Sequence, residues 1–210
     1  MKRIFLIGDS IRKGYDKYVK MAFDGVAEVA YPSENCRFTS YVIRNLRDWK
    51  KATGWYDAEV VHWNVGLWDN LVMLDGLHLT DIETYRKNIE RICHLIKILF
   101  PNAKTIFATS TPVQEELFKD HKRYNKDIEA YNAAAVEIVR HHGGDINDLY
   151  ATMAALPTSY HSDLTHYYTK EGTKVMTEQV VAHIEKVLGI QGHPLDYDAL
   201  FAKTDDIVGI

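Results

Sequence analysis

Near its start the chain places a small residue, a carboxylate and a hydroxyl directly behind an apolar run. Gly8, Asp9 and Ser10 follow "IFLI" at residues 4–7. A serine hydroxyl can attack an ester carbonyl when a neighbouring base takes its proton. The same three residue types also end strands, because Gly tolerates positive φ and short oxygen side chains bond their own backbone. From this segment alone, a turn without chemistry is the simpler interpretation.

A base and an acid that could orient it occur together in "SDLTHYYTKEG", residues 162–172. Asp163 and His166 are three positions apart, and on a helical turn this spacing brings two side chains to the same side. A carboxylate can accept a hydrogen bond from one imidazole nitrogen and so leave the other nitrogen facing a nucleophile. Such pairs are common, so a capped turn with a solvated histidine explains this pair better when it is taken by itself.

The elements that position these residues follow from hydrophobic periodicity. Short apolar or β-branched runs predict strands over residues 3–7, 26–31, 58–66, 104–111 and, more weakly, 143–150. Helical spacing of apolar residues predicts helices over 37–51, 80–100, 122–142 and 169–189. Strands that alternate with helices of this length indicate a parallel sheet covered on both faces. We therefore expect an α/β fold, a flavodoxin-like three-layer α/β/α sandwich with a mainly parallel sheet of about five strands.

Helix ends are also marked in the sequence. Thr80 and Glu83 form a capping box at the start of the second predicted helix, and Pro101 stops that helix. The pair Gly143–Gly144 and the single Gly189 close the last two helices.

Polar segments follow three of the predicted strands. "GDS" follows the first strand, "NVGLWD" (64–69) ends the third and "TSTPV" (109–113) ends the fourth. In open parallel sheets, ligands bind at the carboxyl ends of the strands. We expect these segments to meet at one edge of the sheet.

Taken together, "GDS" behind the first strand, "GLWD" behind the third and "DxxHYYTKEG" before the last helix resemble the GDSL, or SGNH, hydrolase superfamily. The resemblance extends to about residue 189, so an SGNH-type hydrolase domain is expected over 1–189 and a C-terminal extension over 190–210. It implies a carboxylic ester hydrolase in which Ser10 is the nucleophile, His166 the general base and Asp163 its orienting acid. It implies no cofactor and no catalytic metal.

The family's oxyanion-hole blocks are altered here. The second block usually supplies a glycine amide, and Cys36 of "SENCRFTS" (33–40) stands in that place. The resemblance implies donors at Ser10, Cys36 and Gly66, since a backbone N–H serves whatever the side chain. Asn64 lies on the same side of its strand as Gly66. It is a candidate for a further donor, and a purely structural amide is an equal alternative.

The third block usually reads Gly-x-Asn-Asp, but here Trp68 stands in the place of the Asn. Trp68 could donate its indole N–H or form a wall of the pocket. Tyr167, next to the predicted base, is a second candidate for the substrate pocket.

The other potentially reactive residues receive simpler interpretations. No pattern activates Cys36 as a nucleophile. His62 lies inside a predicted strand and fits a core histidine, while His141 and His142 fit caps at a helix end. His78 has no partner at a recognisable spacing, and no metal-binding triad is evident from the spacing of the histidines.

The best-supported substrate is a small acyl ester, an acetyl ester in particular, on a carbohydrate. A lysophospholipase or thioesterase of the same superfamily is the nearest alternative, but it needs a longer apolar acyl channel, and no apolar insertion is present to build one. A non-catalytic carbohydrate-binding relative would not need all three residues of the triad. A nucleotide binder would need a richer phosphate loop than "GDSIRKG".

Composition excludes several partners. The 210 residues carry a net charge of −4, which gives no basic face for nucleic acid. Two cysteines without a CxxC pair fit a reducing compartment, and the short N-terminal apolar run is too brief for a signal peptide. We expect a cytoplasmic protein with no membrane or nucleic-acid partner, and a homo-oligomer is an open alternative.

Overall fold

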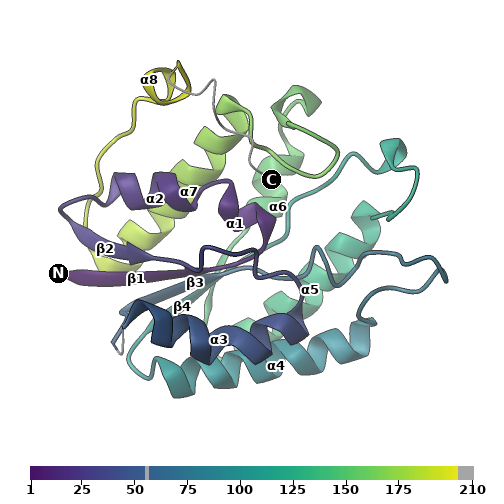
Figure 1. Cartoon of the computed structure of the whole chain (residues 1–210), viewed down its shortest axis with the longest axis horizontal. Helices are drawn as coiled ribbons and strands as arrows, with labels where there is room; N and C mark the ends of the chain where they lie inside the picture. Colours follow the sequence, from purple (N-terminus) through teal and green to yellow (C-terminus); the bar gives the residue numbers. More distant parts are fainter. Residues whose placement is uncertain (55–56, 203–210) are drawn as a thin grey trace.

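The computed structural model describes residues 1–54 and 57–202. Its centre is a sheet of five parallel strands in the order β2-β1-β3-β4-β5, which confirms the predicted architecture (Figure 1). The strands are β1 (Lys2–Ile7), β2 (Ala27–Ala30), β3 (Val60–Trp63), β4 (Lys104–Ala108) and β5 (Asp145–Asn147). The strand order reverses between β1 and β3, and the carboxyl ends of such a strand pair frame the crevice where open α/β sheets bind ligands.

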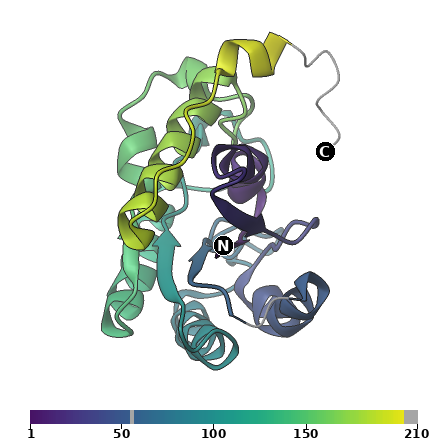
Figure 2. The ribbon, with the colours of Figure 1, turned by 90° about the vertical axis from the view of Figure 1, so that its left-hand side faces the viewer.

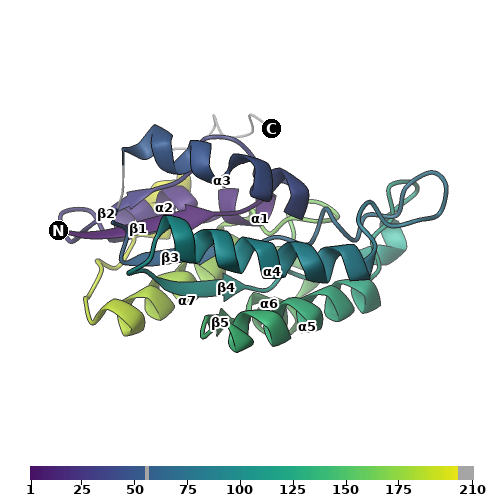
Figure 3. The same ribbon diagram turned by 90° about the horizontal axis from the view of Figure 1, so that it is seen from below.

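Helices cover both faces of the sheet, as Figures 2 and 3 show. One layer includes α2 (Asp16–Ala22) and α7 (Lys170–Leu188), which pack against each other. The other layer includes α3 (Thr39–Thr53), α4 (Ile82–Leu99) and α5 (Asn125–His141), with α4 between its two neighbours. The short elements are α1 (Ser10–Lys13), η1 (Glu115–Leu117), α6 (Leu149–Ala154), η2 (Thr158–Tyr160) and α8 (Tyr197–Ala202).

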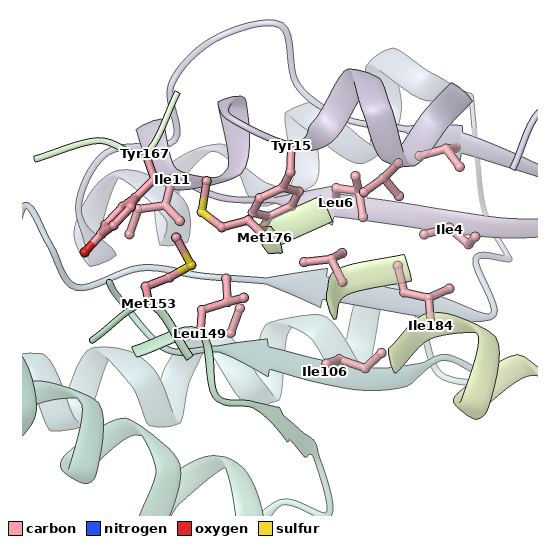
Figure 4. Close-up of a cluster of buried hydrophobic side chains, with 14 of the residues drawn as sticks. Ile4, Leu6, Ile11, Tyr15, Ile106, Leu149, Met153, Tyr167, Met176 and Ile184 are labelled. Atoms are coloured by element: carbon pink, nitrogen blue, oxygen red, sulfur yellow. The ribbon is translucent and has the colours of Figure 1, made fainter. Parts of the chain in front are cut away.

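The alternation of side chains along β1 explains why there are two hydrophobic cores. Ile4 and Leu6 point into the layer of α2 and α7, and Phe5 and Ile7 point into the layer of α3 and α4. Figure 4 shows the first core, where Leu6 lies near Met176 of α7. Fully burying one such aliphatic side chain is worth about 1.5–3 kcal/mol. Because β1 is packed on both faces, the position of its carboxyl end is fixed, and so is the position of the polar residues that follow it.

The helix ends agree with the sequence at most positions, with one correction. Gly189 caps α7 in the left-handed conformation at φ 65°, and α4 ends at Leu99, with Phe100 as its C-cap just before Pro101. Asp81, rather than Thr80, is the N-cap of α4, because its carboxylate accepts from the Thr84 amide at 3.0 Å.

Some elements differ from the prediction. The third strand stops at Trp63 instead of residue 66, because the chain turns away through Gly66 at φ 142°. The fifth strand is only Asp145–Asn147. Helices α1 and α2, directly behind "GDS", were not predicted.

The segment after α7 packs back onto the domain. The rings of Tyr197 and Phe201 lie 6.2 Å and 5.9 Å from that of Tyr18, and Asp198 forms an ion pair with Lys170 at 2.7 Å. Residues 203–210 of the predicted extension lie outside the described residues. Among the described residues, none of the helices combines the length and apolar character needed to cross a membrane.

Candidate active site

The predicted nucleophile lies at the junction of β1 and α1. Asp9 is the N-cap of α1 and is fully buried; its Oδ1 accepts from the Ile11 amide at 2.9 Å and from the Asn64 side-chain amide at 2.8 Å. Ser10 is the first residue of α1, a position whose N–H has no acceptor within the helix. Asp9 thus shapes the turn, while Ser10 presents its hydroxyl and its amide at the carboxyl end of β1.

Gly8 is required by crowding rather than by its backbone conformation. A Cβ at this position would lie 1.9 Å from Oδ1 of Asn64 and 2.6 Å from Cβ of Arg12. Gly8 is not among the residues with positive φ. Because Gly8 has no Cβ, the side chains of Asn64 behind β3 and Arg12 of α1 can pack closely against the backbone before Ser10.

Arg12 fixes the loop after β2 against the nucleophile segment. Its guanidinium is 1 % exposed and pairs with Asp16, the first residue of α2. It also donates to the carbonyl oxygens of Pro32 at 2.9 Å and Glu34 at 2.6 Å. A buried charge with these partners is satisfied. Arg12 could not be predicted from the sequence, because its partners are loop carbonyls that no pattern marks.

The predicted base and acid form the expected hydrogen bond. Nδ1 of His166 lies 2.8 Å from Oδ2 of Asp163, whose Oδ1 accepts from the amides of Thr165 and His166 at 2.7 Å and 2.8 Å. Partial burial opposes ionisation of Asp163, but these hydrogen bonds outweigh it and lower the pKa of the carboxyl. Nε2 of His166 is buried and has no hydrogen-bond partner among the described residues. The nitrogen that a general base needs is therefore unoccupied by other groups.

Tyr168 connects the base to the nucleophile. Its hydroxyl donates to the carbonyl oxygen of Ser10 at 2.5 Å, and its ring stacks on that of His166 with centroids 4.6 Å apart at 21°. Burial raises the pKa of Tyr168, so the hydroxyl keeps its proton at neutral pH. A Cβ on Gly14 would lie 2.8 Å from the Tyr168 ring, so α1 leaves space for it. One aromatic ring thus spans the gap between Ser10 and His166.

The loop after β4 anchors the same region. The Gln114 amide donates to the carbonyl oxygen of Leu164 at 2.9 Å, and the Gln114 side chain donates to that of Asp163 at 3.1 Å. Segments that follow β1 and β4 therefore meet the loop that precedes α7, as expected from the carboxyl ends of parallel strands.

Cys36 does not fit the predicted role of oxyanion donor. Its amide donates to the carbonyl oxygen of Gly8 at 3.1 Å and is thus already used. The amide of the next residue, Arg37, donates to Oδ1 of Asn35 at 2.8 Å. Burial raises the pKa of the Cys36 thiol to about 11, which also disfavours a thiolate nucleophile.

Asn64 and Gly66 lie behind β3, where the third block was predicted. One side-chain N–H of Asn64 is directed to Asp9, and its Oδ1 is buried without a partner among the described residues. Gly66 adopts φ 142°, and a Cβ there would lie 2.9 Å from the Tyr85 hydroxyl. Asn64 contacts the turn of Asp9, and the part of Asn64 and Gly66 in an oxyanion hole stays a prediction.

The Asp69 side chain has a structural role at the start of α3. Its carboxylate accepts from the Thr39 amide at 3.2 and 3.1 Å and from the Thr39 hydroxyl at 2.6 Å, so it fixes the start of α3. Burial raises the pKa of Asp69 to about 6, although these hydrogen bonds oppose the shift.

Arg123 is a further charged group that the sequence did not indicate. Its Nε donates to the carbonyl oxygen of Leu67 at 2.7 Å, next to the half-buried Trp68. Burial lowers the pKa of Arg123, while the nearby Asp9 carboxylate counteracts this. A guanidinium thus supports the segment in which Trp68 replaces the family's Asn.

Tyr167 does not line a pocket, which corrects the prediction. It is 3 % exposed and packs in the core with Ile11 and Met153 (Figure 4). Neighbouring residues in an extended segment point to opposite sides, so it is Tyr168 that faces His166.

Two further histidines that the sequence singled out have polar neighbours away from His166. His62 is buried, with Nε2 3.2 Å from the side-chain nitrogen of Asn147, as a core histidine should be. His78 has a partner that spacing could not reveal: Asp127, 3.1 Å away but 49 positions distant in the sequence.

Comparisons with known proteins support the fold. The sequence matches no protein-family model, and no curated protein matches it significantly. Among solved structures, the chain is similar to a lipase/acylhydrolase from Enterococcus faecalis, with a TM-score of 0.72 and 19% identity over 93% of this chain and 100% of that one. It is also similar to the acetyl xylan esterase AlAXEase, with a TM-score of 0.70 and 16% identity over 87% and 99% of the two chains.

A third similar structure is a mutant of Axe2, an acetylxylan esterase from Geobacillus stearothermophilus. The TM-score is 0.67 and the identity 14%, over 86% of this chain and 93% of that one. At these identities the likeness establishes the shared α/β fold.

Proposed function

We propose that the protein is a serine esterase of the GDSL/SGNH type that hydrolyses a small acyl ester, an acetyl ester in particular, on a carbohydrate. The observation that carries the proposal is the arrangement around Tyr168. Its ring stacks on His166, its hydroxyl bonds the Ser10 carbonyl, and Nε2 of His166 is buried without another partner among the described residues.

The reaction follows from these positions. The Ser10 hydroxyl attacks the ester carbonyl while Nε2 of His166 takes its proton, and the tetrahedral intermediate collapses to an acyl-enzyme. The alcohol leaves with the proton from His166. Water then attacks the acyl group by the same route and releases the acid. Asp163 holds Nδ1 of the ring throughout and stabilises the imidazolium.

The proposed oxyanion donors differ from those of the GDSL/SGNH pattern. The Ser10 amide has no acceptor within its helix, and it is the first donor that we assign. The second N–H of the Asn64 side chain and the Gly66 amide are the others. Cys36 is not among the proposed donors, because its amide already donates to the carbonyl oxygen of Gly8.

The substrate proposal draws on three observations. Trp68 is half-buried beside the third block, and a large rigid ring there limits the acyl group. The loop that contains it is braced by Arg123. Two of the similar structures are the acetyl xylan esterase AlAXEase and a mutant of the acetylxylan esterase Axe2, and another is a lipase/acylhydrolase.

The experiment is a panel of p-nitrophenyl esters from acetyl to dodecanoyl, together with acetylated xylan. We expect kcat/KM to be highest for acetyl and acetate to be released from the polysaccharide. Faster turnover of octanoyl than of acetyl esters would favour the lysophospholipase or thioesterase alternative. An absence of turnover on every ester would favour the non-catalytic carbohydrate-binding alternative.

A further inference from the structure

A second cluster of potentially functional side chains lies on the surface of α4 and at the end of α5. Glu90 and His94 are four positions apart on α4, and His142 is the C-cap of α5. Figure 3 shows α4 and α5 side by side. The N-terminus of α5 lies by the loop after β4, where Asn125 bonds Val113. The 17 residues of α5 place His142 about 25 Å further along that helix.

The three side chains converge on one point. Oε1 of Glu90 lies 2.7 Å from Nε2 of His142 and 3.4 Å from Nε2 of His94. The two imidazole rings are 4.9 Å apart and nearly perpendicular, at 79°. One ligand atom from each residue lies within 4.8 Å of the other two.

We propose that Glu90, His94 and His142 bind a divalent transition-metal ion of the Zn²⁺ class. Zn²⁺ binds imidazole nitrogen and carboxylate oxygen at about 2.0–2.2 Å, so two ligand atoms of a tetrahedral site lie about 3.3–3.5 Å apart. The Glu90–His94 separation of 3.4 Å already matches this value. The Glu90–His142 contact has to open by roughly 0.7 Å, and the two histidine nitrogens have to approach each other by at most about 1.5 Å.

The side chains are free to make these adjustments. His94 is 62 % exposed and Glu90 44 % exposed, so both can change rotamer without repacking the core. His142 is the more enclosed ligand at 20 % and serves as the fixed member.

The chemistry of the donors selects the ion. The Glu90 carboxylate already lies within hydrogen-bond distance of both imidazoles. Two imidazoles and one carboxylate suit Zn²⁺, Ni²⁺ or Cu²⁺, whereas Mg²⁺ and Ca²⁺ prefer oxygen ligands alone.

An ion here would join α4 to α5. Such an ion binds the folded state preferentially, since the unfolded chain separates His142 from the other two ligands by about 50 residues. The site could not be predicted from the sequence, because helical periodicity relates Glu90 to His94 but does not relate either residue to His142. The inference does not depend on the proposed esterase activity.

Isothermal titration of the EDTA-treated and dialysed full chain with ZnCl₂ tests the site. We expect one ion per chain and a rise in Tm on saturation, with MgCl₂ producing neither effect. His94→Ala and His142→Ala should each weaken Zn²⁺ binding by about tenfold or more. Glu90→Gln should also weaken it, because the amide lacks the negative charge.

Three matched variants separate this site from other histidines. His141→Ala removes the exposed neighbour of His142, and His78→Ala removes another histidine paired with a carboxylate. His166→Ala removes the histidine of the candidate active site. All three should bind Zn²⁺ as the wild type does. Binding that survives His94→Ala and His142→Ala unchanged, or a wild-type chain that binds no Zn²⁺, would overturn the proposal.

Discussion

The hydroxyl of Tyr168 donates a 2.5 Å hydrogen bond to the carbonyl oxygen of Ser10, 158 positions earlier in the chain. The same ring stacks on His166. The proposed nucleophile and the proposed base belong to separate segments, one behind β1 and one before α7. Tyr168 contacts both segments through one rigid side chain, so we expect it to position His166 relative to Ser10.

Tyr168→Phe should lower kcat on p-nitrophenyl acetate by up to about tenfold, because a hydrogen bond of about 0.5–1.5 kcal/mol no longer fixes the Ser10 backbone. KM should change little. Tyr168→Ala should lower kcat further, since it also removes the stack on His166. Tyr150→Phe is the control, because its hydroxyl bonds Glu129 instead. Equal kcat for wild type and Tyr168→Phe would show that the hydrogen bond from Tyr168 to the Ser10 carbonyl does not contribute to catalysis.

The pH dependence of activity should reveal the Asp163–His166 pair. A base must be neutral to accept a proton, so kcat/KM should rise with pH across the range in which imidazoles lose their proton, whose ordinary pKa is about 6.5. The lowered pKa of Asp163 keeps this carboxylate ionised throughout that range. Asp163→Asn should lower kcat by roughly 10²–10⁴-fold at neutral pH, because the ring loses its tautomer preference.

Asp127→Asn is the matched control for that variant, since Asp127 also pairs with a histidine, His78, at 3.1 Å. It should leave the pH profile unchanged. A wild-type profile that is flat between about pH 5 and 9 would exclude a histidine base.

Trp68 and Asn64 should produce different kinetic signatures. If the Trp68 ring limits the acyl pocket, Trp68→Ala should flatten the preference for acetyl over butyryl and hexanoyl esters. Each methylene is worth about 1–3 kcal/mol in an apolar pocket, so the effect should grow with chain length. If Asn64 is an oxyanion donor, Asn64→Ala should lower kcat for every ester by about 10²–10³-fold. Equal effects on all chain lengths in Trp68→Ala would show that its ring does not form the wall.

The sequence predicted the α/β architecture of the fold, but it did not predict correctly which groups could donate hydrogen bonds in an oxyanion hole. The assignment of Ser10, His166 and Asp163 came from the resemblance of "GDS" and "DxxHYYTKEG" to the GDSL/SGNH superfamily, because each segment alone favours a simpler interpretation, and it stays a prediction. Cys36 was assigned wrongly, since a sequence does not show that an amide is already bonded to the Gly8 carbonyl. Tyr167 and Tyr168 are adjacent, and which of them faces the base depends on the direction in which the chain enters α7.

Arg12, Arg123 and the partnership of His78 with Asp127 rest on contacts across 20 or more positions. Periodicity carries no information about such contacts. For the same reason, the cluster of Glu90, His94 and His142 could not be predicted from the sequence.

Asp69 gives a stability test that is independent of activity. Burial raises its folded-state pKa from 3.8 to about 6. A carboxyl whose pKa is raised by folding stabilises the folded state fully at pH values below its ordinary pKa. For Asp69 this stabilisation is lost as pH rises through about 6. Between about pH 4 and pH 8, the unfolding free energy of the wild type should therefore fall by about 2–3 kcal/mol relative to Asp69→Asn. Urea unfolding of both proteins at the two pH values measures this difference, and a difference that does not vary with pH would contradict the raised pKa.

The central proposal is that Ser10 is the nucleophile, and covalent trapping tests this proposal most directly. The protein is incubated with diisopropyl fluorophosphate, its intact mass is measured and the modified peptide is mapped, while p-nitrophenyl acetate hydrolysis is followed in parallel. We predict one adduct per chain on Ser10, loss of activity in step with labelling, and no adduct in Ser10→Ala, whose turnover should be lower by several powers of ten. An adduct on another residue, or a Ser10→Ala variant that is folded and keeps more than about a tenth of wild-type turnover, would contradict the account.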